Sequence, residues 1–178
     1  MNNENDHPLS ELGIVARVNI PEKGLFLTSR TFTCPPGYYY CVFNNTSAGP
    51  EFIQNFGPNQ QGKLEKDQDI YRVAIGGAPY HYDFKSPFSM IDGTTVDIEF
   101  QLKIKVSDGV RVARWVIQDK IDPLNRLARD INNLIDQEIS PMEYSKVFLA
   151  KTKEIKLSNQ GLKGIIKKNI DPDEYGII

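Results

Sequence analysis

Side chains of two kinds alternate without a break from Thr94 to Val106. Successive side chains of a β-strand point to opposite faces of the sheet, so the alternation predicts a long antiparallel-type strand with one dry and one wet face. The turn pair Asp92-Gly93 opens this strand. Its dry face consists of Thr94, Val96, Ile98, Phe100, Leu102, Ile104 and Val106. A strand of this kind implies a sheet that another layer of structure must cover.

The residues before Thr94 also read as strands separated by turns. Cys34-Pro35-Pro36-Gly37 is a strong breaker of regular structure. Asn44–Gly62 is rich in glycine, proline and asparagine and is predicted as a loop, interrupted by the short apolar piece Phe52-Ile53. After the long strand, Val110–Ile117 is predicted as a strand or a short connecting segment. The other predicted strands are Leu12–Ile20, Leu25–Leu27, Tyr38–Phe43, Ile70–Ile75 and Tyr80–Phe84.

From Asp122 onward the apolar period changes from two to 3.6, which predicts helices. Asp122 can cap a helix that begins at Pro123, since the N–H that proline lacks would be unpaired there. Ser140-Pro141-Met142-Glu143 has the pattern of a capping box and predicts a second helix. A third is predicted from Ser158 to near Asn169. The apolar stripes are Leu124, Leu127, Ala128, Ile131, Leu134, Ile135 and Ile139 in the first helix, and Leu162, Ile165 and Ile166 in the third.

Strands followed by helices indicate an α+β fold. A length of 178 residues suits one domain, or one domain of two lobes, with a core that needs no disulfide or metal. The net charge of -2 gives no basic surplus for binding nucleic acid. The polar start Met1–Glu11 is unlike a signal peptide, and no run approaches the ~20 apolar residues that span a bilayer. We expect a soluble, cytoplasmic domain.

One stretch has the spacing of a nucleotide site. Gly57–Lys63 carries the glycines and lysine of a phosphate-binding loop, but Leu64 stands where Ser or Thr should hold the metal ion. No amphipathic helix follows to supply the N–H groups and dipole that bind phosphate. The stretch is therefore predicted to be a surface loop.

No other residues have the pattern of a catalytic or metal site. His81 has no cysteine or second histidine nearby, and Asp97 and Glu99 share the wet face of the long strand with lysines. Cys34 and Cys41 are predicted to be reduced, partly buried thiols. We therefore predict no enzyme, no cofactor and no metal.

Lysines gather between Lys146 and Lys168, where seven of them accompany a single acid, Glu154. They read either as a solvated helical face or as a surface for an anionic partner such as lipid headgroups, at about 1 kcal/mol per well-placed lysine. The candidate contact residues are Lys151, Lys153, Lys156, Lys163, Lys167 and Lys168.

Several short motifs occur in the order seen in the SPFH (band 7) family, which includes stomatins, prohibitins and flotillins and whose fold recurs in the shoulder of the major vault protein. The motifs are Cys34-Pro35-Pro36-Gly37-Tyr38, Gly49-Pro50, Asp92-Gly93 before the long strand, Asp108 after it, Asp122-Pro123 and Glu174-Tyr175-Gly176-Ile177. The chain resembles that family from about Thr33 to Ile178. The organisation is then an N-terminal extension with a strand, 1–32, and an SPFH-like domain, 33–178, strand-rich to 118 and helical from 122.

The resemblance implies a curved antiparallel sheet covered by C-terminal helices and no catalysis. Family members form rings or cages beneath membranes and hold client proteases or channels. They usually carry an N-terminal hydrophobic or acylated segment and a long coiled coil, whereas Met1–Glu11 is polar and the chain stops at Ile178. The chain is thus either a domain of a longer protein or a soluble relative.

These observations together predict a non-enzymatic scaffold domain that self-associates and organises membrane-proximal assemblies. The expected partners are further copies of the chain, a client membrane protein or protease, and the membrane surface. One alternative is a ligand-binding or enzymatic domain with a site among Tyr38, Tyr39, Tyr40, Tyr80 and Tyr82. Another is a structural cage subunit like the vault shoulder.

Overall fold

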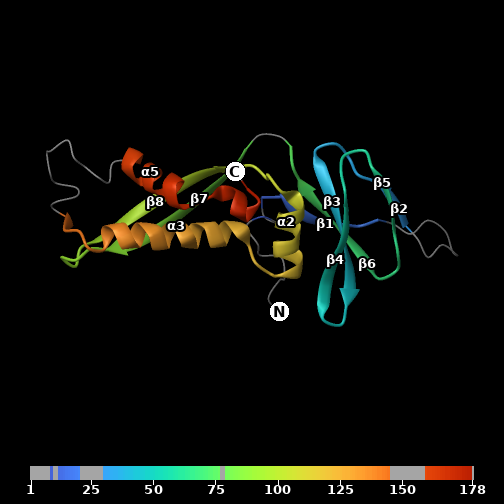
Figure 1. Ribbon diagram of the computed structural model, residues 1–178, viewed down its shortest axis with the longest axis horizontal. Helices are drawn as coiled ribbons and strands as arrows, with labels where there is room; N and C mark the ends of the chain where they lie inside the picture. The colour runs from blue at the N-terminus through green and yellow to red at the C-terminus, as the bar shows by residue number, and fades with distance from the viewer. Residues whose placement is uncertain (1–8, 10–11, 21–29, 77–78, 145–158, 178) are drawn as a thin grey trace. The chain divides into compact units, whose positions relative to one another are not determined.

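The computed structural model describes residues 9, 12–20, 30–76, 79–144 and 159–177 (Figure 1). They form mixed α+β structure with antiparallel sheets, as the order of the predicted elements indicated. The chain divides into two compact units. Unit 1 combines residues 1–80, 104–124 and 173–178, and unit 2 combines residues 81–103 and 125–172.

A four-stranded antiparallel sheet with the order β1-β6-β3-β4 forms the centre of unit 1. Central β3 pairs with β4 on one side and with β6 on the other. The strands are β1 (Val15–Val18), β3 (Tyr38–Thr46), β4 (Gly49–Phe56) and β6 (Gln68–Ala74). The strands predicted at Leu12–Ile20, Tyr38–Phe43 and Ile70–Ile75 are thereby confirmed in shifted bounds, while Leu25–Leu27 lies outside the described residues.

The loop predicted for Asn44–Gly62 is wrong for most of its length and holds only at residues 47–48 and 57–60. β3 runs on to Thr46, turns at Ser47-Ala48, and returns as β4. The Thr46 hydroxyl donates to the Gly49 carbonyl (2.7 Å) and accepts from the Ala48 N–H, so a side chain stabilises the hairpin turn. Polar residues on β4 hid the strand, because an edge strand needs few apolar side chains.

Strand β3 is buried on both faces from Tyr40 to Phe43, so its sequence there is apolar without alternating. Tyr40 and Val42 pack into a cluster with Cys34, Leu64 and Ile70. The side chains that alternate with them point to the opposite face, where Phe43 makes edge-to-face contacts with the rings of Phe52 and Tyr71, at centroid distances of 5.7 and 5.6 Å.

Two short strands, β2 (Arg30–Thr33) and β5 (Gln61–Leu64), pair antiparallel over the first cluster. Gly62 lies there beneath the rings of Phe32 and Phe56, which meet edge to face at 5.0 Å. A Cβ at this position would collide with Phe32 and lie 2.7 Å from Phe56 Cζ. This glycine of the loop-like motif is therefore required for packing.

The segment Val110–Ile117, predicted as a strand or connector, is helical. Helix α2 (Gly109–Ala113) continues into a π-helical turn, η1 (Arg114–Gln118). Asp108 caps α2 by accepting from the Arg111 N–H at 3.0 Å. The buried residues Val112, Ala113, Val116 and Ile117 recur at helical spacing.

The C-terminal residues fold back onto unit 1. Gly176 adopts φ +71, and its carbonyl accepts from the N–H groups of Ser107 and Asp108. Ile177 forms an antiparallel bridge with Val106, and Tyr175 packs edge to face against Trp115 at 6.2 Å. The four-residue 3₁₀ helix η2 (Pro172–Tyr175) leads into this contact.

Unit 2 is built on a ribbon of two long strands, β7 (Tyr80–Ser89) and β8 (Thr95–Ile104). The alternation predicted for Thr94–Val106 is confirmed, because every position of the dry face is at least half-buried and every position of the wet face is exposed. At the turn, the Asp92 carboxylate accepts from the N–H groups of Thr94 and Tyr144, which lowers the pKa of Asp92.

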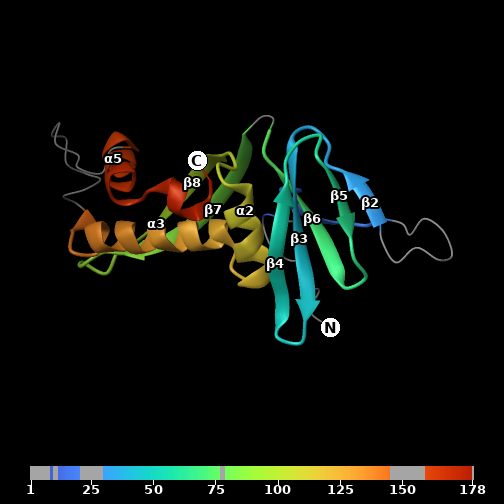
Figure 2. The same ribbon diagram turned by 45° about the vertical axis from the view of Figure 1, so that its right-hand side comes forward.

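Helix α3 (Pro123–Ile139) begins where the sequence predicted and runs along the β7–β8 ribbon (Figures 1 and 2). Asp122 accepts from the Leu124 N–H at 2.7 Å and so acts as the predicted cap. The predicted stripe is buried except for Leu134, which is half-buried. The apolar face therefore supplies the cover that the ribbon requires.

The two later helices are described only in part. The Ser140 hydroxyl donates to Asp136 at 2.8 Å, and the first helical residue beyond it is Tyr144, whose N–H bonds to Asp92. The rest of the predicted second helix lies outside the described residues. Helix α5 (Asn159–Asn169) ends at the predicted residue, with Leu162, Ile165 and Ile166 half-buried.

Candidate functional site

The β7–β8 ribbon has one strand edge suited to further pairing. The Met90 N–H donates to the Thr94 carbonyl at 2.8 Å and closes the hairpin. Continuing this pairing along the strands places Phe84 opposite Phe100, in agreement with their stacked rings at 4.7 Å. Hydrogen-bonded pairs alternate with non-bonded pairs, so Pro87 falls at a position whose nitrogen points away from β8. Proline tolerates such a position because it has no N–H to donate.

It follows that the outer edges of the two strands differ. Pro87 interrupts the row of outward donors on β7. On β8 the outward N–H groups belong to alternate residues without a proline, namely Thr95, Asp97, Glu99, Gln101 and Lys103. Within the described part of the chain, no third strand pairs with this ribbon. In the described part of the chain, the outward backbone groups of β8 therefore pair with no other strand.

The exposed face of the ribbon carries opposite charges in contact. Lys85 Nζ lies 3.0 Å from Asp97 and 3.9 Å from Glu99. The hydrogen bond to Asp97 raises the pKa of Lys85, and all three side chains are more than half exposed. This arrangement is a solvated ion-pair network. Asp97 and Glu99 lie beside a lysine on the wet face, as the sequence predicted. His81 is exposed on the same face of β7.

The lysine surface is described only on α5. Lys163, Lys167 and Lys168 are exposed there, and the last two lie in the final turn, where positive charge stabilises the helix dipole. Lys151, Lys153 and Lys156 lie outside the described residues.

The tyrosines proposed as an alternative site have separate packing roles. Tyr38 lies under the Arg72 guanidinium at 5.4 Å, and Tyr39 contacts the place where a Gly109 Cβ would stand. Tyr40 is buried beside Phe32, whose ring centroid is 5.6 Å away. Tyr80 belongs to unit 1, and Tyr82 belongs to unit 2, where its hydroxyl donates to Asn125 at 3.3 Å. The three side chains on β3 do not converge on one cavity.

Both cysteines are free and fully buried. Burial raises the pKa of Cys41 to about 12, with a further contribution from the negative charge of Asp108. Burial also raises the pKa of Cys34, whose Sγ donates to the Tyr38 carbonyl at 3.2 Å. Protonated, shielded thiols are inert, so the cysteines serve as core residues.

The loop-like motif Gly57–Lys63 does not form a phosphate cradle. The Gly57 N–H donates to the Gln60 side chain at 2.7 Å, and the Asn59 N–H donates to the Cys34 carbonyl at 2.7 Å. Residues 61–63 belong to β5 instead of a helix. The prediction that Gly57–Lys63 is a surface loop is therefore correct only for residues 57–60.

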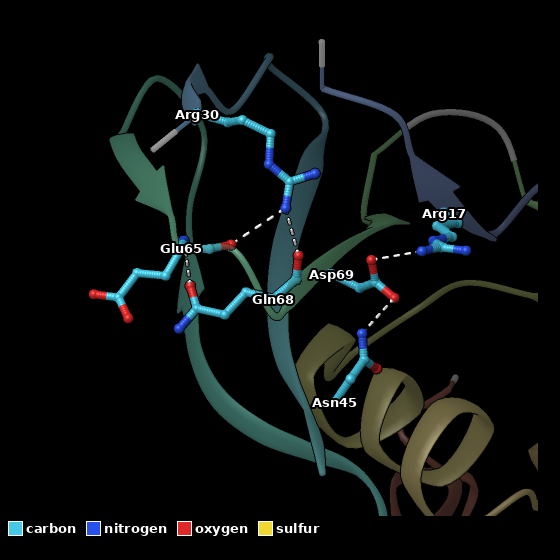
Figure 3. Close-up of polar contacts among 6 residues, drawn as sticks. All are labelled: Arg17, Arg30, Asn45, Glu65, Gln68 and Asp69. Carbon is cyan, nitrogen blue, oxygen red and sulfur yellow. Dashed lines mark hydrogen bonds and ion pairs between the residues drawn. The ribbon is translucent and has the colours of Figure 1, made fainter. Parts of the chain in front are cut away.

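A polar pocket of about 340 Å³ lies where β1 ends and β2 and β6 begin, lined by Arg17, Val18, Asn19, Arg30 and Asp69. Arg17 donates to one oxygen of Asp69 at 2.6 Å, and Asn45 donates to the other at 3.0 Å (Figure 3). Burial alone would raise the pKa of Asp69, but these hydrogen bonds and the charges of both arginines lower it overall.

Arg30 supports the turn between β5 and β6 at the same pocket. Its Nη2 donates to the carbonyls of Glu65 and Gln68 at 3.2 and 2.9 Å (Figure 3). Sequence reasoning missed this pocket, because Arg17 and Asp69 are 52 positions apart and neither belongs to a motif. Only strand pairing reveals it. Arg17 faces Tyr71 in the β1–β6 register, and Asp69, two residues before Tyr71, lies on the same face of β6 and diagonal to Arg17.

No protein-family model matches the chain, and no curated protein matches it. Among the described residues, no helix is long and apolar enough to cross a membrane. The described parts of the chain also contain no group of three or more His, Cys, Asp or Glu placed to hold a metal ion.

Proposed function

We propose that the chain is an SPFH-like scaffold domain that self-associates by adding strands at the outer edge of β8. The observation that carries this proposal is the pair of ten-residue strands whose only described partners are each other, with proline on β7 but none on β8. Strand addition at such an edge gains a row of main-chain hydrogen bonds. Pairing of β8 with β8 of a second copy would give a two-fold dimer, whereas a ring or filament would require β8 to pair with a different edge of the next copy.

The SPFH resemblance supplies the biological setting of the proposal. A curved sheet covered by helices would present the β8 edge to a neighbouring subunit, and the assembly would hold a client membrane protein or protease at the cytoplasmic face of a membrane. The α+β order and the α3 helix along the ribbon are compatible with this arrangement. The domain acts by binding, without chemistry of its own.

Self-association should depend on the β8 edge. Gln101→Pro removes an outward N–H near the middle of β8, and we expect the dissociation constant of the assembly to rise about tenfold, since one hydrogen bond is lost and the added strand meets the proline ring. Light scattering over a range of concentrations measures the change.

The matched control is Asp83→Pro, at the facing position of β7, which should leave assembly unchanged. A strict monomer at high concentration excludes the proposal, and equal effects of both variants exclude the β8 edge.

We further propose that the exposed α5 lysines contact an anionic membrane surface. Replacing Lys163, Lys167 and Lys168 with glutamine should raise the dissociation constant for phosphatidylserine vesicles about 100-fold at low salt, because each lysine contributes about 1 kcal/mol. Sedimentation of the chain with the vesicles measures this constant. Binding of the unmodified chain should fall as salt rises. Glutamine at Lys85, Lys103 and Lys105, which are also exposed, is the control. Salt-insensitive binding, no binding, or equal loss in the control contradicts the contact.

A further inference from the structure

The pocket lined by Arg17, Arg30 and Asp69 holds more positive than negative charge. Two guanidinium groups approach one carboxylate, and both lower the pKa of Asp69. Figure 3 shows Asp69 between the two arginines, with the Glu65 carboxylate directed away from them. Among the described residues that line the pocket, two positive charges therefore accompany one negative charge.

The hydrogen-bonding groups of the pocket are only partly used. Both hydrogen bonds that Arg30 makes with described residues come from Nη2, and its Nε and Nη1 have no hydrogen-bond partner in the described part of the chain. Asp69 engages Arg17 through a single nitrogen, and the Arg17 side chain is 65% exposed. Each guanidinium carries five N–H donors in a planar fork that matches the oxygens of a carboxylate or a phosphate.

We propose that this pocket binds an oxyanion group, carboxylate or phosphate, of a small molecule. Arg17 and Arg30 donate to the anion, and Asp69 positions Arg17 while competing with the anion for it. The cavity volume of about 340 Å³ is at the lower end for small-ligand sites, which suits one anionic group and little more. All of these residues belong to unit 1, whereas the proposed assembly edge belongs to unit 2, so either proposal can fail alone.

Titration of the full chain with inorganic phosphate and, separately, with acetate tests the pocket. At constant ionic strength set with chloride, we expect saturable NMR shifts of the arginine side-chain N–H signals and the Asn19 and Asp69 amides, with a dissociation constant on the order of millimolar. A response to phosphate alone assigns a phosphorylated ligand, and a response to acetate assigns a carboxylate. No saturable response to either anion overturns the proposal.

Three variants separate anion binding from structure. Arg17→Gln should weaken binding about tenfold through the loss of a charge-assisted hydrogen bond. Asp69→Asn should strengthen binding, because it removes the competing negative charge while keeping an oxygen for Asn45 or Arg17. Lys85→Gln, which removes an exposed charge from unit 2, should change nothing. If Asp69→Asn weakens binding as much as Arg17→Gln does, the anion site is excluded. Preserved dispersion of the amide signals shows that each variant is folded.

Discussion

Replacing Phe43 with alanine should lower the free energy of unfolding of unit 1 by about 3–5 kcal/mol. Phe43 is fully buried on central strand β3. Its ring contacts Phe52 and Tyr71 edge to face, so the truncation removes two aromatic contacts as well as buried apolar area. Both neighbours belong to the sheet, whose backbone hydrogen bonds prevent it from collapsing into the space. A cavity therefore remains and adds to the loss.

Urea unfolding followed by fluorescence measures this change directly. Trp115 is the only tryptophan of the chain and packs against Tyr175 within unit 1. The control is Ile53→Ala on β4, where the bulge between Val42 and Phe43 leaves Ile53 45% exposed. That variant should cost less than about 1 kcal/mol. A similarly small loss for Phe43→Ala would contradict burial of the sheet on both faces.

The second large effect is expected in unit 2, where Ile135→Ala should cost about 2–5 kcal/mol. Ile135 is fully buried on α3, between Ile131 and Ile139, which are also buried. A two-stranded ribbon is marginal by itself in water, so its order depends on the helix that covers it. Loss of the central apolar side chain should loosen both elements together.

Amide hydrogen exchange is the suitable measurement, because the tryptophan belongs to the other unit. Exchange should accelerate in α3, β7 and β8 together in the Ile135→Ala protein. Asn133→Ala, on the exposed side of the same helix, is the matched control and should leave exchange unchanged or slower, since alanine has the higher helix propensity. Faster exchange confined to α3 would show that the helix does not support the ribbon.

Whether the sequence predicted a helix or strand depended on how many faces of that element are buried. β8 and α3 each have one buried face, so their period is visible in the sequence and both were predicted closely. The helix at 109–118 was missed because it is short, and its apolar run resembles a buried strand. β4 was missed because Ile53, Gln54 and Asn55 are all exposed, which removes the alternation.

The candidate sites differ in the same way. The β8 edge could be foreseen in part, since a long alternating strand must lie in a sheet that has an edge. The choice of β8 over β7 required the register, because only the pairing shows that the nitrogen of Pro87 points outward. The polar pocket could not be foreseen, since Arg17, Arg30 and Asp69 come from three strands with no shared motif.

The sequence by itself determined the long strand, its dry face, the Asp122 cap and the α+β order, because alternation, helical period and capping are local properties of the chain. Tertiary structure alone decided that Gly62 serves aromatic packing, that the Gly57 and Asn59 amides are occupied, and that Arg17, Arg30 and Asp69 line one pocket. Those facts depend on which strands pair and in what register. The strand Thr95–Ile104 belongs to both groups: its pattern predicted a sheet, and its pairing decided which edge remains for a partner.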